Sequence, residues 1–446
     1  MDKKFIPIIG MEIHIEPNTN TKMFCSCPQD HFGKSPNTQV CPICLGLPGA
    51  LPYANREGIV KTIKLGLALG STISKFSKFY RKNYFYPDLP KGFQTSQLDS
   101  PFCLGGSLGG KQINHIHLEE DAGKLVHLPA DATPQALQAG ETQGKVSLID
   151  FNRSGCVLIE VVTEPVFHET SEVIDFVKEL QLIARYLDVG DCDMEKGRMR
   201  LEANVSMSQD GSLPNYKVEL KNINSFRFLE KAINAELVRQ EKALKNGEVL
   251  VQETRGYDEV KQTTYSQRTK SEANDYRYFP EADLPPVRFD EKEVEKIKGD
   301  LPELPAEKRK IFLDRYKIAS DFIEILVSDK SRADYFEESV KLGQEASLSP
   351  KVIADLMINK KLDSEYPEPA GLVRKIAELT KVEYASNDDL EKAVKSVVTE
   401  NEKAVKDYKE GNGNVIGFLI GMVQKKLQGK GNAQLVRAKL LENLQS

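Results

Sequence analysis

The sequence predicts an α+β fold in which one large domain of strands and helices, residues 1–290, is followed by two small all-α helical modules. The segment Ile8–Ile15 has the period-two pattern that is typical of a strand with one buried face. Residues Thr170–Leu187 and Phe226–Leu244 carry apolar side chains at helical spacing. After three prolines between residues 280 and 286, the composition changes to Lys, Glu, Leu and Ala at helical spacing, which indicates the end of the large domain.

Residues 291–362 are predicted to form a three-helix domain. Helical spacing begins after Pro305, and its apolar positions predict a small bundle. The three expected helices are Ala306–Lys317, Ala319–Leu342 and Pro350–Asn359.

A linker, residues 363–386, is predicted to precede a second helical module, residues 387–446. The linker begins with a Pro- and Glu-rich stretch. Behind the capping candidates Asn387 and Asp388, apolar residues recur at i, i+4, i+7 and i+8. The last helix of this module is expected to begin near Asn432.

Charge and hydropathy exclude two classes of protein. Sixty-one basic and 66 acidic side chains give a net charge of −5, which excludes general electrostatic binding of nucleic acid but permits a local basic surface. The longest apolar run, Val415–Val423, is far shorter than the about 20 residues that cross a bilayer. The segment after Met1 lacks the apolar stretch of a signal peptide, so we expect a cytoplasmic protein without a membrane span.

Four of the seven cysteines form a cluster with metal-binding spacing. They are Cys25, Cys27, Cys41 and Cys44. Four thiolates on two short knuckles suit a structural, tetrahedral Zn²⁺ and leave no open position for a catalytic zinc. The first pair is CxC rather than CxxC, so reduced cysteines that only pack remain the alternative. The other cysteines are scattered and are expected to pack in the core.

Carboxylates gather on two predicted strands. Glu12 and His14 share one strand face, and the segment His117–Lys124 carries Glu119 and Glu120 near a strand end. Oxygen ligands with few histidines suit Mg²⁺ that holds a nucleotide phosphate, whereas a solvated strand end is the more ordinary interpretation of each stretch alone.

A third strand pair alternates cations with a carboxylate. Lys217, Glu219 and Lys221 lie on one face and form either a salt-bridge ladder or a phosphate clamp. The aromatic clusters Tyr80–Asp88 and Asn274–Pro280 either stack on a base or an RNA end, or pack at a strand edge.

The sequence has no complete nucleotide-binding glycine motif. Gly105–Lys111 has the spacing of a P-loop, but Gln112 replaces the hydroxyl residue, so we interpret it as a turn. An ATP site would have to be built from strands and carboxylates.

Four long motifs occur in order: Arg81–Gly92, His117–Lys124, Asp150–Gly155 and Asp275–Pro280. On these motifs the chain resembles, over nearly its whole length, the family of aspartyl/glutamyl-tRNA amidotransferase B subunits. It departs from the family pattern at Leu201-Glu202, where Cys-Asp is usual, and at Cys156-Val157, where a residue and Pro usually follow the glycine.

The resemblance implies a ligase. Family members use ATP to convert the side-chain carboxylate of Glu-tRNA(Gln) or Asp-tRNA(Asn) to an acyl phosphate, and ammonia then gives Gln-tRNA(Gln) or Asn-tRNA(Asn). The ammonia comes through a tunnel from the amidase, which is the family's A subunit, and a small C subunit completes the heterotrimer. The implied catalytic domain has an antiparallel sheet similar to the fold of glutamine synthetase and the guanido kinases.

The resemblance also directs attention to particular residues. Within the catalytic domain that the resemblance implies, strand alternation and the density of motifs indicate Lys82, Arg200 and Lys221 as the cations expected to neutralise phosphoryl oxygens. The implied Mg²⁺ ligands are Glu12, His14, Glu119 or Glu120, and Glu219. The cysteine quartet matches the zinc knuckles of many members. The tail resembles the family's tRNA-binding tail, where phosphate contacts are expected from Lys425, Lys426, Lys430, Arg437 and Lys439.

Two other functions remain open on the sequence alone. A non-catalytic zinc-knuckle tRNA-binding protein explains the cysteines and the basic tail but not the carboxylates. A small-molecule metal-dependent kinase explains the carboxylates but not the tail. Whether ATP turnover requires charged tRNA distinguishes these alternatives.

Overall fold

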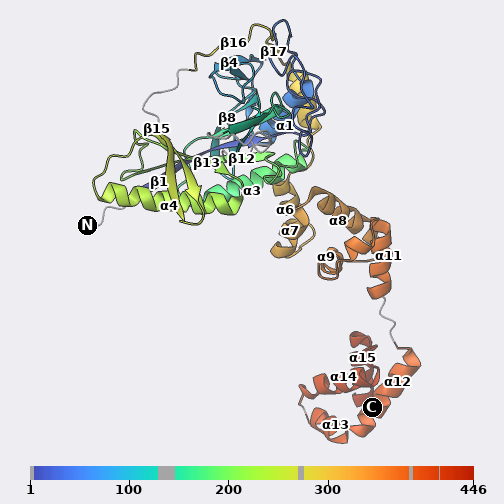
Figure 1. Cartoon of the computed structure of the whole chain (residues 1–446). Helices are drawn as coiled ribbons and strands as arrows, with labels where there is room; N and C mark the ends of the chain where they lie inside the picture. The colour runs from blue at the N-terminus through green and yellow to red at the C-terminus, as the bar shows by residue number, and fades with distance from the viewer. Residues whose placement is uncertain (1–4, 129–145, 270–275, 381–384, 411, 446) are drawn as a thin grey trace, which may run out of the picture. The chain divides into compact units, whose positions relative to one another are not determined.

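A computed structural model describes residues 5–445 except 129–145, 270–275, 381–384 and 411 (Figure 1). The chain forms two compact units: unit 1 comprises Met1–Arg315 with Ile323–Ala333, and unit 2 comprises Tyr316–Phe322 with Asp334–Ser446. The large sheet lies in unit 1, and the C-terminal region is helical, so the predicted α+β class is confirmed.

A ten-stranded sheet forms the centre of unit 1. Its strand order is β15-β14-β13-β12-β1-β11-β8-β6-β2, with β7 paired to β8. All of these pairings are antiparallel except that of β13 with β14. The strands are β1 (Ile6–Ile15), β2 (Thr72–Ile73), β6 (Cys103–Leu104), β7 (Ser107–Leu108), β8 (Lys111–Glu120), β11 (Val157–Thr163), β12 (Met199–Ser208), β13 (Val218–Ile223), β14 (Glu253–Asp258) and β15 (Thr263–Thr269).

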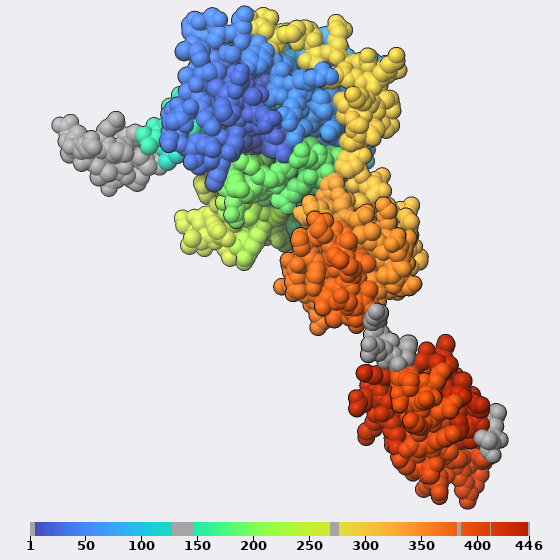
Figure 2. Space-filling view, turned by 90° about the vertical axis from the view of Figure 1, so that its right-hand side faces the viewer, coloured from blue at the N-terminus to red at the C-terminus, as the bar shows by residue number. Residues whose placement is uncertain are grey.

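Within the described residues, three smaller sheets accompany it. Strand β16 (Phe279–Pro280) pairs with β4 (Tyr80–Asn83), which pairs with β5 (Phe93–Ser96). Strand β17 (Val287–Arg288) pairs with β3 (Phe76–Ser77), and β9 (Lys124–Leu128) pairs with β10 (Val146–Asp150). Through β16 and β17, the segment near residues 280–300 lies beside the N-terminal hundred residues (yellow beside blue in Figure 2).

One face of the large sheet is apolar and helix-covered. In β1 the side chains of Ile9, Met11, Ile13 and Ile15 are buried in the core, whereas Glu12 and His14 are only partly buried on the other face. Helices α1 (Arg56–Ala68), α3 (Thr170–Tyr186) and α4 (Phe226–Lys245) contribute to this core (Figure 1). The strand predicted at Ile8–Ile15 and the two long helices are therefore confirmed.

Polar side chains cap the starts of the two long helices. Ser225 accepts a hydrogen bond from the Phe228 amide at 3.1 Å, which starts α4. At α3 the carboxylate of Glu172 accepts from the amide of His168 at 2.9 Å. These caps satisfy amides that have no partner within the helix.

The predicted helix Ala319–Leu342 is wrong, because two helices replace it. Helix α7 (Ser320–Val327) ends before Ser328, and α8 (Lys330–Gly343) begins after Asp329. The Asp329 carboxylate accepts from the Arg332 amide at 2.9 Å, a new N-terminal cap that apolar spacing alone does not reveal. The other helices of this region are α5 (Glu291–Gly299), α6 (Pro305–Asp314) and α9 (Pro350–Asn359).

Much of the segment predicted as a linker is helical. It contains most of α10 (Leu362–Glu365) and all of α11 (Pro369–Thr380), which buries Leu372, Val373 and Ile376. Pro369 stands at the start of α11, where its missing N–H costs nothing, so this proline begins a helix rather than breaking one.

The tail has a small core of its own. It is built from α12 (Asn387–Glu400), α13 (Glu402–Lys409), α14 (Val415–Lys426) and α15 (Ala433–Gln445). The predicted apolar positions Leu390, Val394 and Val397 are buried in this core. Among the described residues, no helix is long and apolar enough to cross a membrane.

Candidate active site

The polar face of the large sheet gathers ionisable side chains from five neighbouring strands. Backbone register sets their rows: His14 lies opposite Arg200 on β12 and opposite Glu160 on β11, and Glu160 lies opposite His117 on β8. One row further along β1, Glu12 lies opposite Glu202. Alternation on antiparallel strands therefore brings acids and bases from distant parts of the chain onto one surface.

The first group comprises His14, Glu119 and Glu160, whose ligand atoms all lie within 4.8 Å of one another. The Nε2 atom of His14 is 3.4 Å from the Glu160 carboxylate and 3.9 Å from that of Glu119. His117 joins them, with its Nε2 3.1 Å from Glu160. Burial opposes the charge on His14, but Glu160 outweighs it and raises the pKa of His14 to about 9.

The second group comprises Glu12, Glu202 and Glu219, again with ligand atoms within 4.8 Å. Lys221 lies 2.9 Å from Glu202 and 3.3 Å from Glu219. Burial, followed by the neighbouring carboxylates of Glu160 and Glu202, raises the pKa of Glu12. The three carboxylates and the Lys221 ammonium together carry a net charge of −2 when all are ionised. One divalent cation would balance this charge.

A β-bulge helps to position this second group. The register between β12 and β13 shifts between Leu201 and Ala203, and Asn222 has a left-handed φ of 62°. Such bulges redirect neighbouring side chains, and here Lys221 contacts the Glu202 carboxylate.

The three predicted cations all lie at the polar face. Lys82 lies 5.0 Å from the centre of the Tyr276 ring, in the aromatic cluster whose first residues, Asn274 and Asp275, lie outside the described residues. Burial opposes its charge, but Glu119 and other acidic groups outweigh it and hold the pKa of Lys82 above its usual value. Arg200 donates to Asp121 at 2.9 Å.

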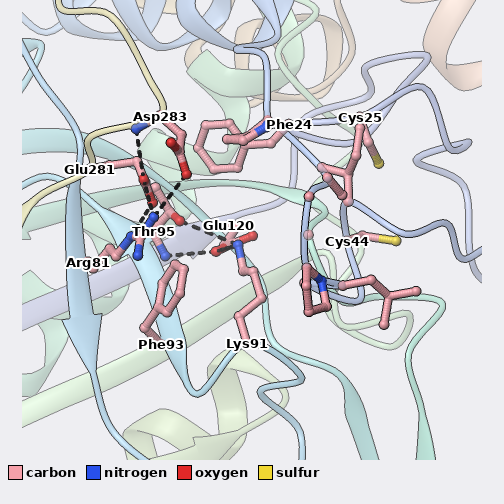
Figure 3. A pocket seen from close by; sticks show the side chains of 18 residues that line it. Phe24, Cys25, Cys44, Arg81, Lys91, Phe93, Thr95, Glu120, Glu281 and Asp283 are labelled. Atoms are coloured by element: carbon pink, nitrogen blue, oxygen red, sulfur yellow. Dashed lines mark hydrogen bonds and ion pairs between the residues drawn. The ribbon is translucent and has the colours of Figure 1, made fainter.

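Glu120 lies apart from the other four predicted magnesium ligands. Its carboxylate contacts the ammonium of Lys91 and accepts from the Thr95 amide at 2.8 Å. Glu120 and Lys91 line a cavity of about 240 Å³ beside the cysteine cluster (Figure 3). Arg81 and Glu281 line it too, and they form a bidentate ion pair with hydrogen bonds of 2.7 and 2.6 Å.

The polar face fits a divalent cation on the chemistry of its donors. The amide of Asn204 donates to Glu12 at 2.8 Å, while its buried Oδ1 has no hydrogen-bond partner among the described residues. An unpaired oxygen acceptor beside clustered carboxylates is a ligand that a metal ion would satisfy.

The cysteine quartet also fits a metal. The Sγ atoms of Cys25, Cys27, Cys41 and Cys44 lie within 4.8 Å of one another. Lys22, fully buried, places its ammonium 3.9 Å from Cys44 Sγ and donates to the carbonyls of Ser154 at 2.8 Å and Gln39 at 2.9 Å. This cation is suited to offset the negative charge of a four-thiolate zinc site.

Three of the five predicted tail cations are available to bind an anion. Lys425, Lys430 and Arg437 are exposed, and no side-chain partner is found for them in the described part of the chain. Lys426 pairs with Glu400, and Lys439 pairs with Glu391 at 2.9 Å and with Glu442 at 3.3 Å.

Sequence reasoning missed three residues of the polar face, His117, Asp121 and Glu160, and it noted Glu202 only as a departure from the family pattern. Glu160 was detectable, because it is the single charged residue of the apolar strand Val157–Thr163. Asp121 is held by Arg153 and Arg200, which overcome its burial and lower its pKa to about 2.

Comparisons with known proteins cover nearly the whole chain. Residues 7–295 match the GatB/GatE catalytic domain, and residues 323–444 match the GatB domain. The chain is 41% identical to an aspartyl/glutamyl-tRNA(Asn/Gln) amidotransferase B subunit (designated 2) of Clostridium acetobutylicum, over 98% of this chain and 99% of that protein. It is 42% and 39% identical to the corresponding B subunits of Thermotoga petrophila and Persephonella marina, over 98% and 99% of this chain and 99% of each relative.

Proposed function

Since the chain belongs to the family of aspartyl/glutamyl-tRNA(Asn/Gln) amidotransferase B subunits, we propose that the polar face of its large sheet is where it activates and amidates misacylated tRNA. The reaction is the ATP-dependent amidation of Glu-tRNA(Gln) or Asp-tRNA(Asn), so the chain is part of a ligase. The observation that carries the proposal is the pair of adjacent acidic groups flanked by Lys82, Arg200 and Lys221.

We assign the magnesium site first to Glu12, Glu202 and Glu219, because these carboxylates carry the excess of negative charge. His14 and Glu119, with Glu160, form the adjoining group. When bound, Mg²⁺ supplies positive charge beside the phosphoryl oxygens of ATP.

The lysines of the polar face are proposed to neutralise charge on the phosphoryl group during the reaction. In the activation step the substrate carboxylate displaces ADP from the γ-phosphate, and the resulting acyl phosphate loses phosphate when ammonia attacks its carbonyl carbon. Charge spreads over the phosphoryl oxygens in the first of these steps. Lys221 contacts Glu202 and Glu219, and the charges of Glu119 and Glu160 hold the pKa of Lys82 above its usual value, so both cations are suited to neutralise that charge.

We propose that unit 1 shares the fold of glutamine synthetase and the guanido kinases. The support is a large, almost entirely antiparallel sheet with one face covered by helices and one face polar. The amidase (the A subunit), as the ammonia source, and the small C subunit are the proposed partners, and a structural zinc is proposed for the cysteine quartet. The cytoplasm is the proposed location.

The two adjacent glutamates of β8 should give different defects. Glu119→Gln should reduce Glu-tRNA-dependent ATP turnover by about 10–100-fold, because Glu119 lies within 4.8 Å of His14 and Glu160 and influences Lys82. Glu120→Gln should instead lower the melting temperature, since it leaves the largely buried Lys91 ammonium without its carboxylate, at a cost of about 1–3 kcal/mol.

Turnover measured against Mg²⁺ concentration, together with thermal unfolding, distinguishes the two variants. The half-saturating Mg²⁺ concentration should stay at the wild-type value in Glu120→Gln. A shift in Glu120→Gln with no change in Glu119→Gln would reverse the assignment.

The exposed tail cations should dominate tRNA binding. Replacing Lys425, Lys430 and Arg437 together by Gln should weaken the affinity for Glu-tRNA and reduce the slope of log affinity against log salt by about 0.7–0.9 for each phosphate that the tail no longer binds. Replacing Lys426 and Lys439, which acidic neighbours already neutralise, should change the slope less. Filter binding over a series of salt concentrations measures both; equal slopes for the two variants would contradict the assignment.

A further inference from the structure

Three metal-ligating side chains meet outside both sites described above. Glu16 follows the end of β1, His31 lies in the loop between the two cysteine pairs, and Cys156 immediately precedes β11. One ligand atom of each lies within 4.8 Å of the other two. Neither the polar face nor the cysteine quartet uses any of these residues.

The cluster is buried and its donor atoms are only lightly engaged. Cys156 is 0% exposed and Glu16 is 5% exposed. The Nε2 atom of His31 lies 3.1 Å from Glu16 Oε2, and the other carboxylate oxygen receives only a long contact, 3.4 Å, from the Gln29 amide. Cys156 Sγ lies 3.6 Å from the Gln29 carbonyl oxygen.

Hydrogen bonds of the Gln29 side chain hold the three segments together without a metal. Gln29 ties the His31 loop to β11, because its side chain accepts from the Val157 amide at 3.0 Å and donates to the Val157 carbonyl at 3.3 Å. Gly155 takes a φ of 80°, and a Cβ there would lie 3.2 Å from the Cβ of Cys44. The donors are thus positioned by contacts that a metal would not have to create.

We propose that Glu16, His31 and Cys156 bind a second metal ion, a borderline-soft divalent cation such as Zn²⁺ or Co²⁺. A thiolate, an imidazole and a carboxylate form a donor set that these ions prefer, whereas the thiolate disfavours Mg²⁺ and Ca²⁺. One cation of charge +2 with one thiolate and one carboxylate is neutral, which suits a buried position. The metal displaces the proton of the Cys156 thiol, which is released to solvent, and it would be held by a ring nitrogen of neutral His31 and by the Glu16 carboxylate.

Access and coordination number are consistent with this site. His31 also lines a cavity of about 790 Å³ together with Lys34, Lys124 and Arg153, so it is the one of the three ligands that borders open space. Three protein ligands leave one tetrahedral position for water. The ion would join the end of β1, the start of β11 and the loop of the cysteine cluster.

The test counts metal on the full-length chain. Wild type and the variants His31→Asn, Cys156→Ser and Cys192→Ser are loaded with Zn²⁺, dialysed against metal-free buffer and measured by elemental analysis. His31→Asn and Cys156→Ser should each hold one zinc fewer per chain than wild type, while Cys192→Ser, which changes a buried cysteine outside the cluster, should match wild type. Because each variant is compared with wild type, the difference does not depend on whether the quartet is filled.

A second measurement tests directly whether the Cys156 thiolate binds the metal. Co²⁺-loaded wild type should show a stronger thiolate-to-cobalt absorption than Co²⁺-loaded Cys156→Ser. His31 is partly exposed, so His31→Asn remains decisive if Cys156→Ser fails to fold. Wild-type metal content in folded His31→Asn would overturn the proposal.

Discussion

Glu12→Gln should abolish Glu-tRNA-dependent ATP consumption while leaving the protein folded. Glutamine keeps the size of the side chain and its contact with Asn204, but removes one of three carboxylates that lie within 4.8 Å of one another. Loss of one metal-ligand charge removes several kcal/mol of transition-state stabilisation, so we expect a decrease of about 10²–10⁴-fold. His14→Ala should have an effect in the same direction through the adjoining group.

The measurement uses the variant assembled with its amidase and small-subunit partners. ATP consumption is followed with and without Glu-tRNA, and glutamine hydrolysis is followed in parallel. Glutamine hydrolysis should persist at its basal rate, because that reaction belongs to the amidase. Glu230→Gln, an exposed glutamate on α4, serves as the matched control and should behave as wild type. Near-normal activation by Glu12→Gln and His14→Ala would place the site on other strands.

Cys44→Ser should destabilise unit 1 strongly. Cys44 is buried, its Sγ accepts from the Cys41 amide at 3.1 Å, and it lies beside the buried ammonium of Lys22. Loss of a structural zinc ligand removes metal-binding free energy that contributes to folding, and leaves Lys22 without a neighbouring thiolate. We expect a loss of roughly 2–5 kcal/mol, which corresponds to a decrease in Tm of at least about 5 °C.

The matched control is Cys192→Ser, in which a hydroxyl replaces a buried thiol that lies 3.7 Å from the Gly190 carbonyl oxygen. Tm is measured by circular dichroism with and without a zinc chelator. The chelator should lower the Tm of wild type and have little further effect on Cys44→Ser. A wild-type Tm that is insensitive to complete zinc removal would show that the four cysteines only pack.

Local patterns predicted much of the polar face, because strand alternation is a property of the backbone. Glu12, His14, Arg200 and Lys221 lie on the face that period two assigns to them. The same rule separates Glu119 from Glu120, since adjacent strand residues point to opposite faces. The sequence left these two glutamates as alternatives, because it does not show which face of the strand meets the other carboxylates.

The arrangement of the strands was not predictable from spacing. Nothing in Ile6–Ile15 indicates that this strand pairs with β11 on one side and β12 on the other, because those contacts join residues far apart in the sequence. Hence Glu160, which lies opposite both His14 and His117, had no visible partners in the sequence. The division of Ala319–Leu342 into two helices was missed for a local reason, the capping carboxylate of Asp329.

The central position of β1 has a consequence for biosynthesis. β1 is synthesised before both of its partner strands, yet Glu12 pairs with Val162 and with Glu202. At about 5–20 residues per second, synthesis of the roughly 200 residues from β1 to the end of β12 takes about 10–40 s. During that time the nascent chain exposes an apolar strand with two unpaired edges, so we expect chaperones that shield such edges to act on it early. Because those long-range pairings also make closure slow, the polar face forms late, after β12 and β13 have been added.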